Sequence, residues 1–263
     1  MRAVAAAALA AVALTGCAGE KDDRRDAVDD YVETVNATQR EALIPWNSAR
    51  MAYAAVGRRE LSDRQLRVLG TAPATIRELR TRIAAVAPPA DARRLRERLL
   101  RLLDLQASVA AEVSAFARYV TAVSPLEQRL ADETAKLRRT LQRSRAQAPE
   151  RQALSRYAAE LAALRRQLER LDPPKALEPW HAGQLARVET LRAGAGAAAT
   201  GLAKKDAALI GSGVAALTSG AAGVPVTEAE RAAIVAYNER LSRIRTASAA
   251  VTSEQARLVR ELA

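Results

Sequence analysis

The stretch that decides the fold is LSRYAAELAALRRQLERLDPP, residues 154–174. Its large apolar side chains recur every three or four positions, which places them on one face of a helix. These positions are Leu154, Tyr157, Leu161, Leu164, Leu168 and Leu171. Pro173 and Pro174 follow, and a helix does not continue through such a pair because proline lacks the amide hydrogen and restricts the residue before it. The pattern therefore predicts an amphipathic helix that ends at a Pro-Pro corner.

The same pattern occurs 85 positions earlier in the chain. There the apolar residues Ile76, Leu79, Ile83 and Val86 precede Pro88 and Pro89, and the offset places them on Leu161, Leu164, Leu168, Leu171, Pro173 and Pro174. We interpret this match as the duplication of a helical hairpin, with repeats over about residues 60–124 and 145–220.

Helical spacing also runs through the segments around Tyr31 and Tyr237, near the two ends of the chain. Pro45 is expected to break or kink the first of these, and Ser124-Pro125 to end the long helix that follows the first Pro-Pro pair. Thr227 and Glu230 have the spacing of a capping box for the last helix. No long stretch alternates with period 2. The sequence thus predicts an all-α fold, an antiparallel helical bundle built from two duplicated hairpins, as a single domain over residues 26–263.

The composition excludes several kinds of catalytic and metal-binding site. The chain has 263 residues, and only 3% of them are aromatic. A single Cys excludes an internal disulfide framework, and a single His excludes sites that need two imidazoles, which covers most zinc and di-iron chemistry. Neither residue has the partners or spacing for nucleophilic catalysis. We expect no cofactor, no metal and no enzymatic activity.

The chain opens with a short basic segment, an apolar run from Ala3 to Leu14 and the tetrapeptide Leu14-Thr15-Gly16-Cys17. This tetrapeptide resembles the lipobox of bacterial lipoprotein precursors. The resemblance implies that a diacylglycerol is attached to the Cys17 sulfur and that cleavage before Cys17 removes residues 1–16 as a signal peptide. The apolar run is too short for a transmembrane helix, which needs about 20 apolar residues.

The lipobox resemblance also predicts where in the cell the protein is located. Residues 17–25 would form a short lipid-anchored tether, and the protein would face the extracytoplasmic side of the cell membrane. The lipobox, the Arg-rich composition and the helical hairpins together resemble helical lipoproteins of actinobacteria. Beyond Cys17, this resemblance implies no functional residue.

The net charge of +11 is large. Loss of Arg2 with the signal peptide would leave about +10, and export argues against nucleic acid as the partner. Anionic headgroups, wall polymers or a protein are the partners that remain. The clusters Arg93-Arg94-Arg96-Arg98, Arg138-Arg139 and Arg165-Arg166 lie among acidic residues, so we interpret them as solvated helix faces.

Three other segments match functional motifs only in part, and we favour a structural interpretation of each. Glu178 and His181 have a metal-ligand spacing, but a second His is missing, so we expect a helix first turn in which Trp180 packs at the corner and loss of His181 costs little stability. The stretch from Gly194 to Ala199 matches a relaxed dinucleotide fingerprint, and Gly196 to Gly201 with Lys204 partly matches a phosphate loop. A helix whose small residues let a neighbour pack closely explains both better. Residues 207–227 carry no charge and form a packing helix more readily than a membrane span.

Two functional hypotheses follow. The first is a lipid-anchored interaction or scaffold module at the cell envelope. The alternative is a solute- or lipid-binding protein that holds an apolar ligand between the two hairpins, in a cavity rimmed by Trp46, Tyr53, Trp180 or Tyr237. A tightly filled core favours the first hypothesis.

Overall fold

The structure, a computed structural model, describes residues 16–56, 62–144, 146–224 and 228–262. Every regular element in these ranges is helical, which confirms the all-α class. The helices are α1 (Gly16–Val56), α2 (Asp63–Ala85), α3 (Arg93–Arg143), α4 (Gln147–Leu168), α5 (Glu178–Lys204), α6 (Ala207–Ala221) and α7 (Glu228–Leu262), with 3₁₀ turns η1 (Ala90–Ala92) and η2 (Lys175–Leu177).

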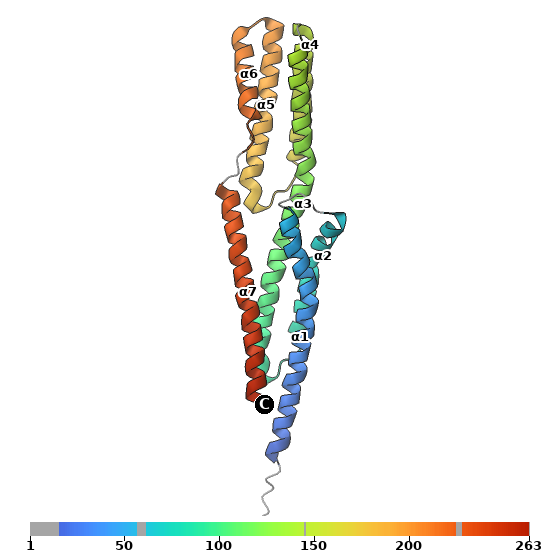
Figure 1. Ribbon diagram of the computed structural model, residues 1–263, viewed down its shortest axis with the longest axis vertical. Helices are drawn as coiled ribbons and strands as arrows, with labels where there is room; N and C mark the ends of the chain where they lie inside the picture. The colour runs from blue at the N-terminus through green and yellow to red at the C-terminus, as the bar shows by residue number, and fades with distance from the viewer. Residues whose placement is uncertain (1–15, 57–61, 145, 225–227, 263) are drawn as a thin grey trace, which may run out of the picture.

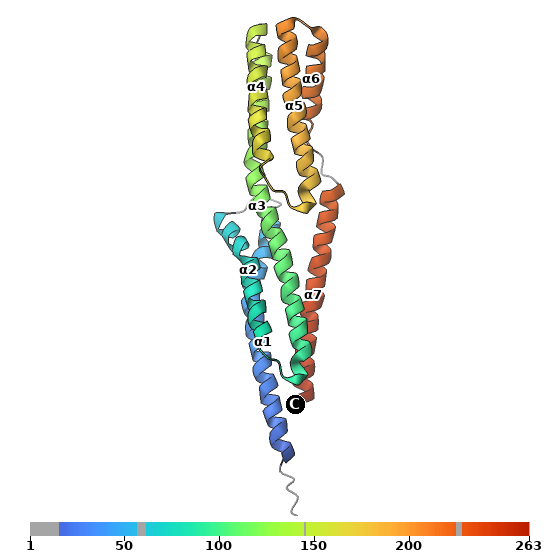
Figure 2. The same ribbon diagram turned by 180° about the vertical axis from the view of Figure 1, so that it is seen from behind.

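The helices pack around two hydrophobic cores that lie end to end along a rod (Figure 1). The basal core lies among α1, α2, α7 and the first half of α3, and the apical core among α4, α5, α6 and the second half of α3. We call the end that holds the start of α1 and the end of α7 the base. The opposite end, the apex, carries the α3–α4 and α5–α6 turns (Figures 1 and 2). The sequence predicts one bundle, and the structure divides it into two packed units.

The two units share α3, a single helix of 51 residues. The predicted helix end at Ser124-Pro125 is wrong, because Pro125 lies inside α3. An interior proline costs a helix about 3 kcal/mol, and packing on both sides offsets that cost. Val123 and Leu130 are buried in the apical core, and Phe116 packs against both cores.

α1 also continues through a proline, since Pro45 lies within it. Pro45 and Trp46 are both buried, so tertiary packing again outweighs the local preference. Residues 18–25, assigned from the sequence to a tether, belong to this helix as well. The position of Cys17 is therefore connected to the basal core by continuous helix.

α7 buries its apolar stripe only in part. Ile244, Val251 and Leu258 are buried in the basal core, whereas Ile234 is 52% exposed. The capping box predicted from Thr227 and Glu230 involves a residue outside the described ranges.

Both Pro-Pro pairs lead into a long helix through the same local geometry. Pro89 has φ −54° and ψ 155°, Pro174 has φ −56° and ψ 145°, and each is followed by a 3₁₀ turn. α2 and α4 also bury apolar side chains at positions 85 apart, namely Leu69, Ile76, Leu79 and Ile83 in α2 and Leu154, Leu161, Leu164 and Leu168 in α4. Val86 and Leu171 lie beyond the helix ends. These matches support the duplication hypothesis, and a common origin of the hairpins stays a prediction.

Candidate functional site

Cys17, the predicted lipidation site, lies in the first turn of α1 at the base of the rod (Figure 1). Residues 1–15, most of the predicted signal peptide, lie outside the described residues. Lipid attachment at Cys17 stays a prediction, with its position now fixed relative to the bundle.

A cluster of three rings lies where the first turn of α5 packs against α3, in the apical unit. Tyr119 from α3 lies edge-on to Trp180 and to His181 from the first turn of α5, with ring centroids 6.2 Å and 5.8 Å away. The Tyr119 hydroxyl and His181 Nδ1 form a buried hydrogen bond of 2.8 Å. Pro179 occupies the first turn of α5, as a helix start tolerates. The sequence interpretation as a helix first turn with a packed Trp180 is confirmed.

Burial sets the protonation of this cluster. It lowers the pKa of His181, because desolvation penalises the charged imidazolium. Burial, followed by the nearby Glu127 carboxylate, raises the pKa of Tyr119 to about 12. At neutral pH the pair is therefore a neutral imidazole and a neutral phenol, which fits a structural hydrogen bond.

The Glu178 and His181 side chains lie in different surroundings. Glu178 is exposed, whereas His181 is buried with Nδ1 bonded to Tyr119. Within the described ranges no three His, Cys, Asp or Glu side chains gather closely enough to hold a metal ion.

The glycine-containing segment of α5 is a packing surface for α6. A Cβ atom added at Gly213 of α6 would lie 2.6 Å from the Ala198 amide nitrogen and 2.7 Å from the Gly194 carbonyl oxygen. Contacts this short leave room only for glycine. The segment lies inside a helix, so the close-packing interpretation is confirmed over the dinucleotide and phosphate-loop patterns.

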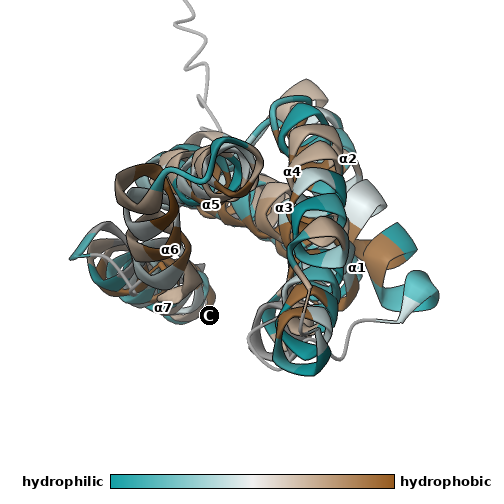
Figure 3. Ribbon diagram, turned by 90° about the horizontal axis from the view of Figure 1, so that it is seen from above, coloured by the Kyte–Doolittle hydropathy of each residue, from teal (hydrophilic) through white to brown (hydrophobic). Residues whose placement is uncertain are grey.

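α6 covers only part of the uncharged segment 207–227, since it ends at Ala221. Seen from the apex, its residues are largely coloured hydrophobic where it lies beside α5 (Figure 3). Its inner face carries Gly213 and Gly220, and Val214 on its outer face is 52% exposed. Among the described helices, none is both long and apolar enough to cross a membrane.

The aromatic residues proposed to rim a ligand cavity are divided between the two cores. Trp46 is buried in the basal core, Tyr237 packs against that core, and Trp180 belongs to the ring cluster. The side chain of Tyr53 is not described. Between α3, α4 and α5, a cavity lined by Leu130, Leu164 and their neighbours measures about 10 Å³, space for about one water molecule.

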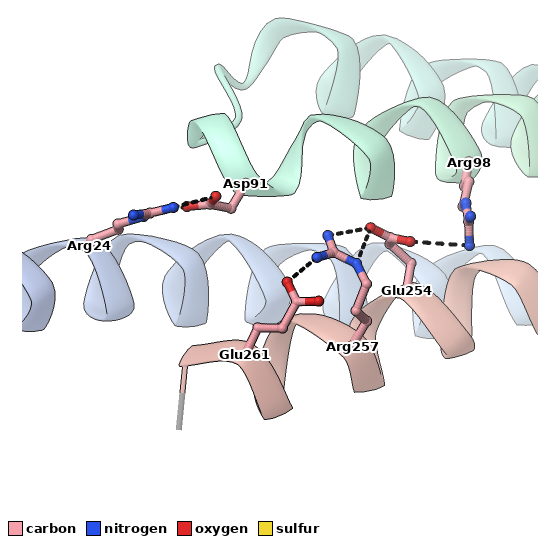
Figure 4. A network of polar contacts seen from close by, with 6 residues as sticks. All are labelled: Arg24, Asp91, Arg98, Glu254, Arg257 and Glu261. Carbon is pink, nitrogen blue, oxygen red and sulfur yellow. Dashed lines mark hydrogen bonds and ion pairs between the residues drawn. The ribbon is translucent and has the colours of Figure 1, made fainter.

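Ion pairs fasten the helices at the base (Figure 4). Glu254 of α7, whose side chain is only 3% exposed, pairs with Arg98 of α3 at 3.2 Å and with Arg257 at 2.6 Å. Arg257 also pairs with Glu261, and Arg24 of α1 bonds Asp91 of η1 at 2.6 Å. The hydrogen bond from Arg257 is the main cause of the lowered pKa of Glu254. This network holds the end of α7 against α3.

The arginines near the apex differ from those in the network at the base, where the charges are paired. Arg138 and Arg139 near the end of α3 are exposed, and in the described part of the chain neither pairs with a carboxylate. The sequence interpretation placed them among acidic residues, as it did Arg165, which pairs with Glu169 and Glu189. Sequence alone does not show which of these clusters has acidic neighbours on other helices.

Comparisons of the chain with protein-family models, with curated proteins and with solved structures found no match.

Proposed function

We propose that the chain is an exported lipid-anchored protein, attached to the membrane through Cys17, and that its helical rod acts as a scaffold that presents an interaction surface away from the membrane. The observation that carries this proposal is the shared helix α3. Because one helix belongs to both cores, the apical unit is held in line with the basal unit. Cys17 and the apex lie at opposite ends of that assembly (Figure 1).

The lengths of α3 and α1 support a role as a spacer between the membrane and the interaction surface. At 1.5 Å per residue, α3 is about 75 Å long. At the base, α1 extends past η1, since Arg24 lies beside η1 and seven further residues lead back to Cys17. A helical connection between the anchor and the core keeps the rod from swinging as freely as it would on an extended tether.

Two cavities among the described residues support the interaction hypothesis over the ligand-binding alternative. An apolar ligand needs an apolar pocket of several hundred Å³, and the cavity in the apical core measures about 10 Å³. A larger hollow of about 540 Å³ lies on α1, but its lining is mostly polar and charged, with Asp29, Asn36 and Arg40 among its residues. The surface is therefore the part of the molecule that we propose to be functional.

Fluorescence energy transfer from a label on the protein to acceptor lipids in the membrane tests the proposal. The full-length precursor is processed in a bacterial host, reconstituted in vesicles with acceptor lipids, and labelled through an unnatural amino acid at Ala90 in the base or Gln142 at the apex, both exposed. We expect strong transfer from position 90, weak transfer from position 142, and loss of both in Cys17→Ser. Equal transfer from both positions would overturn the scaffold role, and unchanged partitioning of Cys17→Ser would overturn the lipid anchor.

A further inference from the structure

The apex gathers exposed cations from two turns that are far apart in sequence. The α3–α4 turn supplies one group and the α5–α6 turn the other, and both turns lie at the same end of the rod (Figures 1 and 2). We define the apical patch as Arg138, Arg139, Arg143, Arg151, Lys204 and Lys205, all of them exposed. Within the described ranges none of the six has a carboxylate partner.

Two acidic residues are next to members of this patch in sequence. Asp206 caps the start of α6, where its carboxylate accepts a hydrogen bond of 3.0 Å from the Leu209 amide. Glu150 is half-buried in the first turn of α4. The six cations outnumber these two carboxylates, so the patch keeps a net positive charge.

The charge along the rod is uneven. On the shaft, some cations pair with acids across helices, as Arg80 does with Asp104 and Arg129 with Glu160, whereas exposed arginines such as Arg77 have no carboxylate partner within the described ranges. Toward the base, residues 20–33 of α1 hold seven acidic and three basic residues. The rod is thus electrically polar along its length, and its cationic end is the one farthest from Cys17.

The backbone conformation of Lys205 is a second, independent observation that concerns the cations of the apical patch. Its φ of 56° and ψ of 34° place it in the left-handed region, and it is the sole non-glycine residue with positive φ among those described. Glycine normally fills this helix-end position, because a side chain there costs about 1 kcal/mol. The chain thus keeps a cation where local backbone energy favours glycine.

We propose that the apical patch binds a linear polyanion whose charges are phosphate groups repeated along the chain, such as an anionic polymer of the cell envelope. Four of the six cations are arginine, whose planar guanidinium donates paired hydrogen bonds to phosphate oxygens. Cations on two separate turns suit a polymer with repeated charges, which can contact both groups at once. Membrane headgroups fit less well, because the patch lies about 75 Å along α3 from the base. This choice of a polymer over headgroups rests on the proposed anchor at the base, whereas binding of a polyanion to the patch can be measured without it.

The test measures binding of long-chain inorganic polyphosphate to the full chain in neutral detergent, against inorganic phosphate, poly-glutamate and anionic vesicles. At 0.1 M salt each released counterion is worth about fivefold in affinity, so Arg138→Gln/Arg139→Gln should weaken polyphosphate binding about 25-fold. The matched control is Arg80→Gln/Arg243→Gln, which removes the same charge from the paired shaft and should change affinity by less than about twofold. Equal loss in both double variants would overturn the proposal.

Lys205→Gly separates a binding role from a structural one. This variant relieves the left-handed strain, so it should raise the melting temperature while it weakens polyphosphate binding about fivefold. Unchanged binding would remove Lys205 from the site. Equal affinity for poly-glutamate would overturn the preference for phosphate, and vesicle binding that competes with polyphosphate would assign the patch to a lipid surface instead.

Discussion

The hydroxyl of Tyr119 lies 2.8 Å from Nδ1 of His181, and this buried hydrogen bond joins the middle of α3 to the first turn of α5. The only histidine of the chain is therefore part of the packing between the shared helix and the apical unit. This placement differs from the expectation that His181 contributes little to stability.

His181→Ala should lower the free energy of unfolding by about 1–3 kcal/mol, because it leaves the buried Tyr119 hydroxyl without a partner. Tyr119→Phe should cost less than His181→Ala, since it removes the hydroxyl without leaving a cavity. Denaturant titration followed by circular dichroism measures both. If the two variants are as stable as the wild type, the hydrogen bond contributes nothing.

Stability should also depend on pH through this histidine. Burial holds the pKa of His181 below its unfolded value of about 6.5, so the unfolded chain binds the proton more readily. The contribution of the neutral imidazole is fully present above about pH 6.5 and is lost as the pH falls through the folded pKa. We expect the unfolding free energy to decline over this range in the wild type and to decline less in His181→Gln. Parallel pH curves for the two proteins would contradict this.

Two glycines in α6 give a matched test of helix packing. Gly213→Ala should destabilise the protein, because the new methyl group meets backbone atoms of α5 at 2.6 Å and 2.7 Å. Gly211→Ala, two residues away in open space, should stabilise it by about 0.5–1 kcal/mol, because alanine favours a helix over glycine. Thermal melts of the two variants should shift in opposite directions. A shift in the same direction would mean that α6 is not closely packed on α5.

The core of the apical unit should be sensitive to truncation. Leu164 is 1% exposed, and Leu164→Ala should cost about 2–5 kcal/mol through lost burial and the cavity that remains. Leu43→Ala serves as a control because Leu43 is 49% exposed. A comparable loss in both variants would mean that Leu164 is not a core residue.

Glu254 should matter more than another glutamate on the same helix. Glu254→Gln removes the charge that pairs with Arg98 and Arg257, and we expect a loss of about 1–3 kcal/mol. Glu239→Gln should change stability by less than about 0.5 kcal/mol, since Glu239 is exposed and lies 4.0 Å from Arg243. The measurement is again denaturant unfolding at neutral pH. Similar values for the two variants would show that burial of Glu254 adds no stability.

Sequence periodicity predicted the helices and their buried faces where local pattern and tertiary packing agree. The stripe from Leu154 to Leu168 is buried throughout, and the helices end before Pro88 and Pro173 as expected. Pro45 and Pro125 show the limit of such reasoning, because packing of distant segments holds a helix together across a residue that locally disfavours it.

The candidate surface was harder to predict than the fold. Arg138 and Lys204 are 66 positions apart in sequence, and only the return of two helical hairpins to the same end places their turns together. Charge counts along the chain do not show which cations find a carboxylate on another helix. Such pairings depend on tertiary structure, which a local pattern does not encode.

The sharing of α3 also has a thermodynamic consequence. Each core packs against a different half of this 51-residue helix, so melting of one unit would leave that half of α3 without partners. An isolated helical half has little stability in water, and the second unit would then lose one of its walls. The two units should consequently unfold in a single cooperative transition, with the calorimetric and van't Hoff enthalpies equal, although their side chains form separate interiors. Damage near Phe116, which contacts both interiors, would then weaken the whole rod at once.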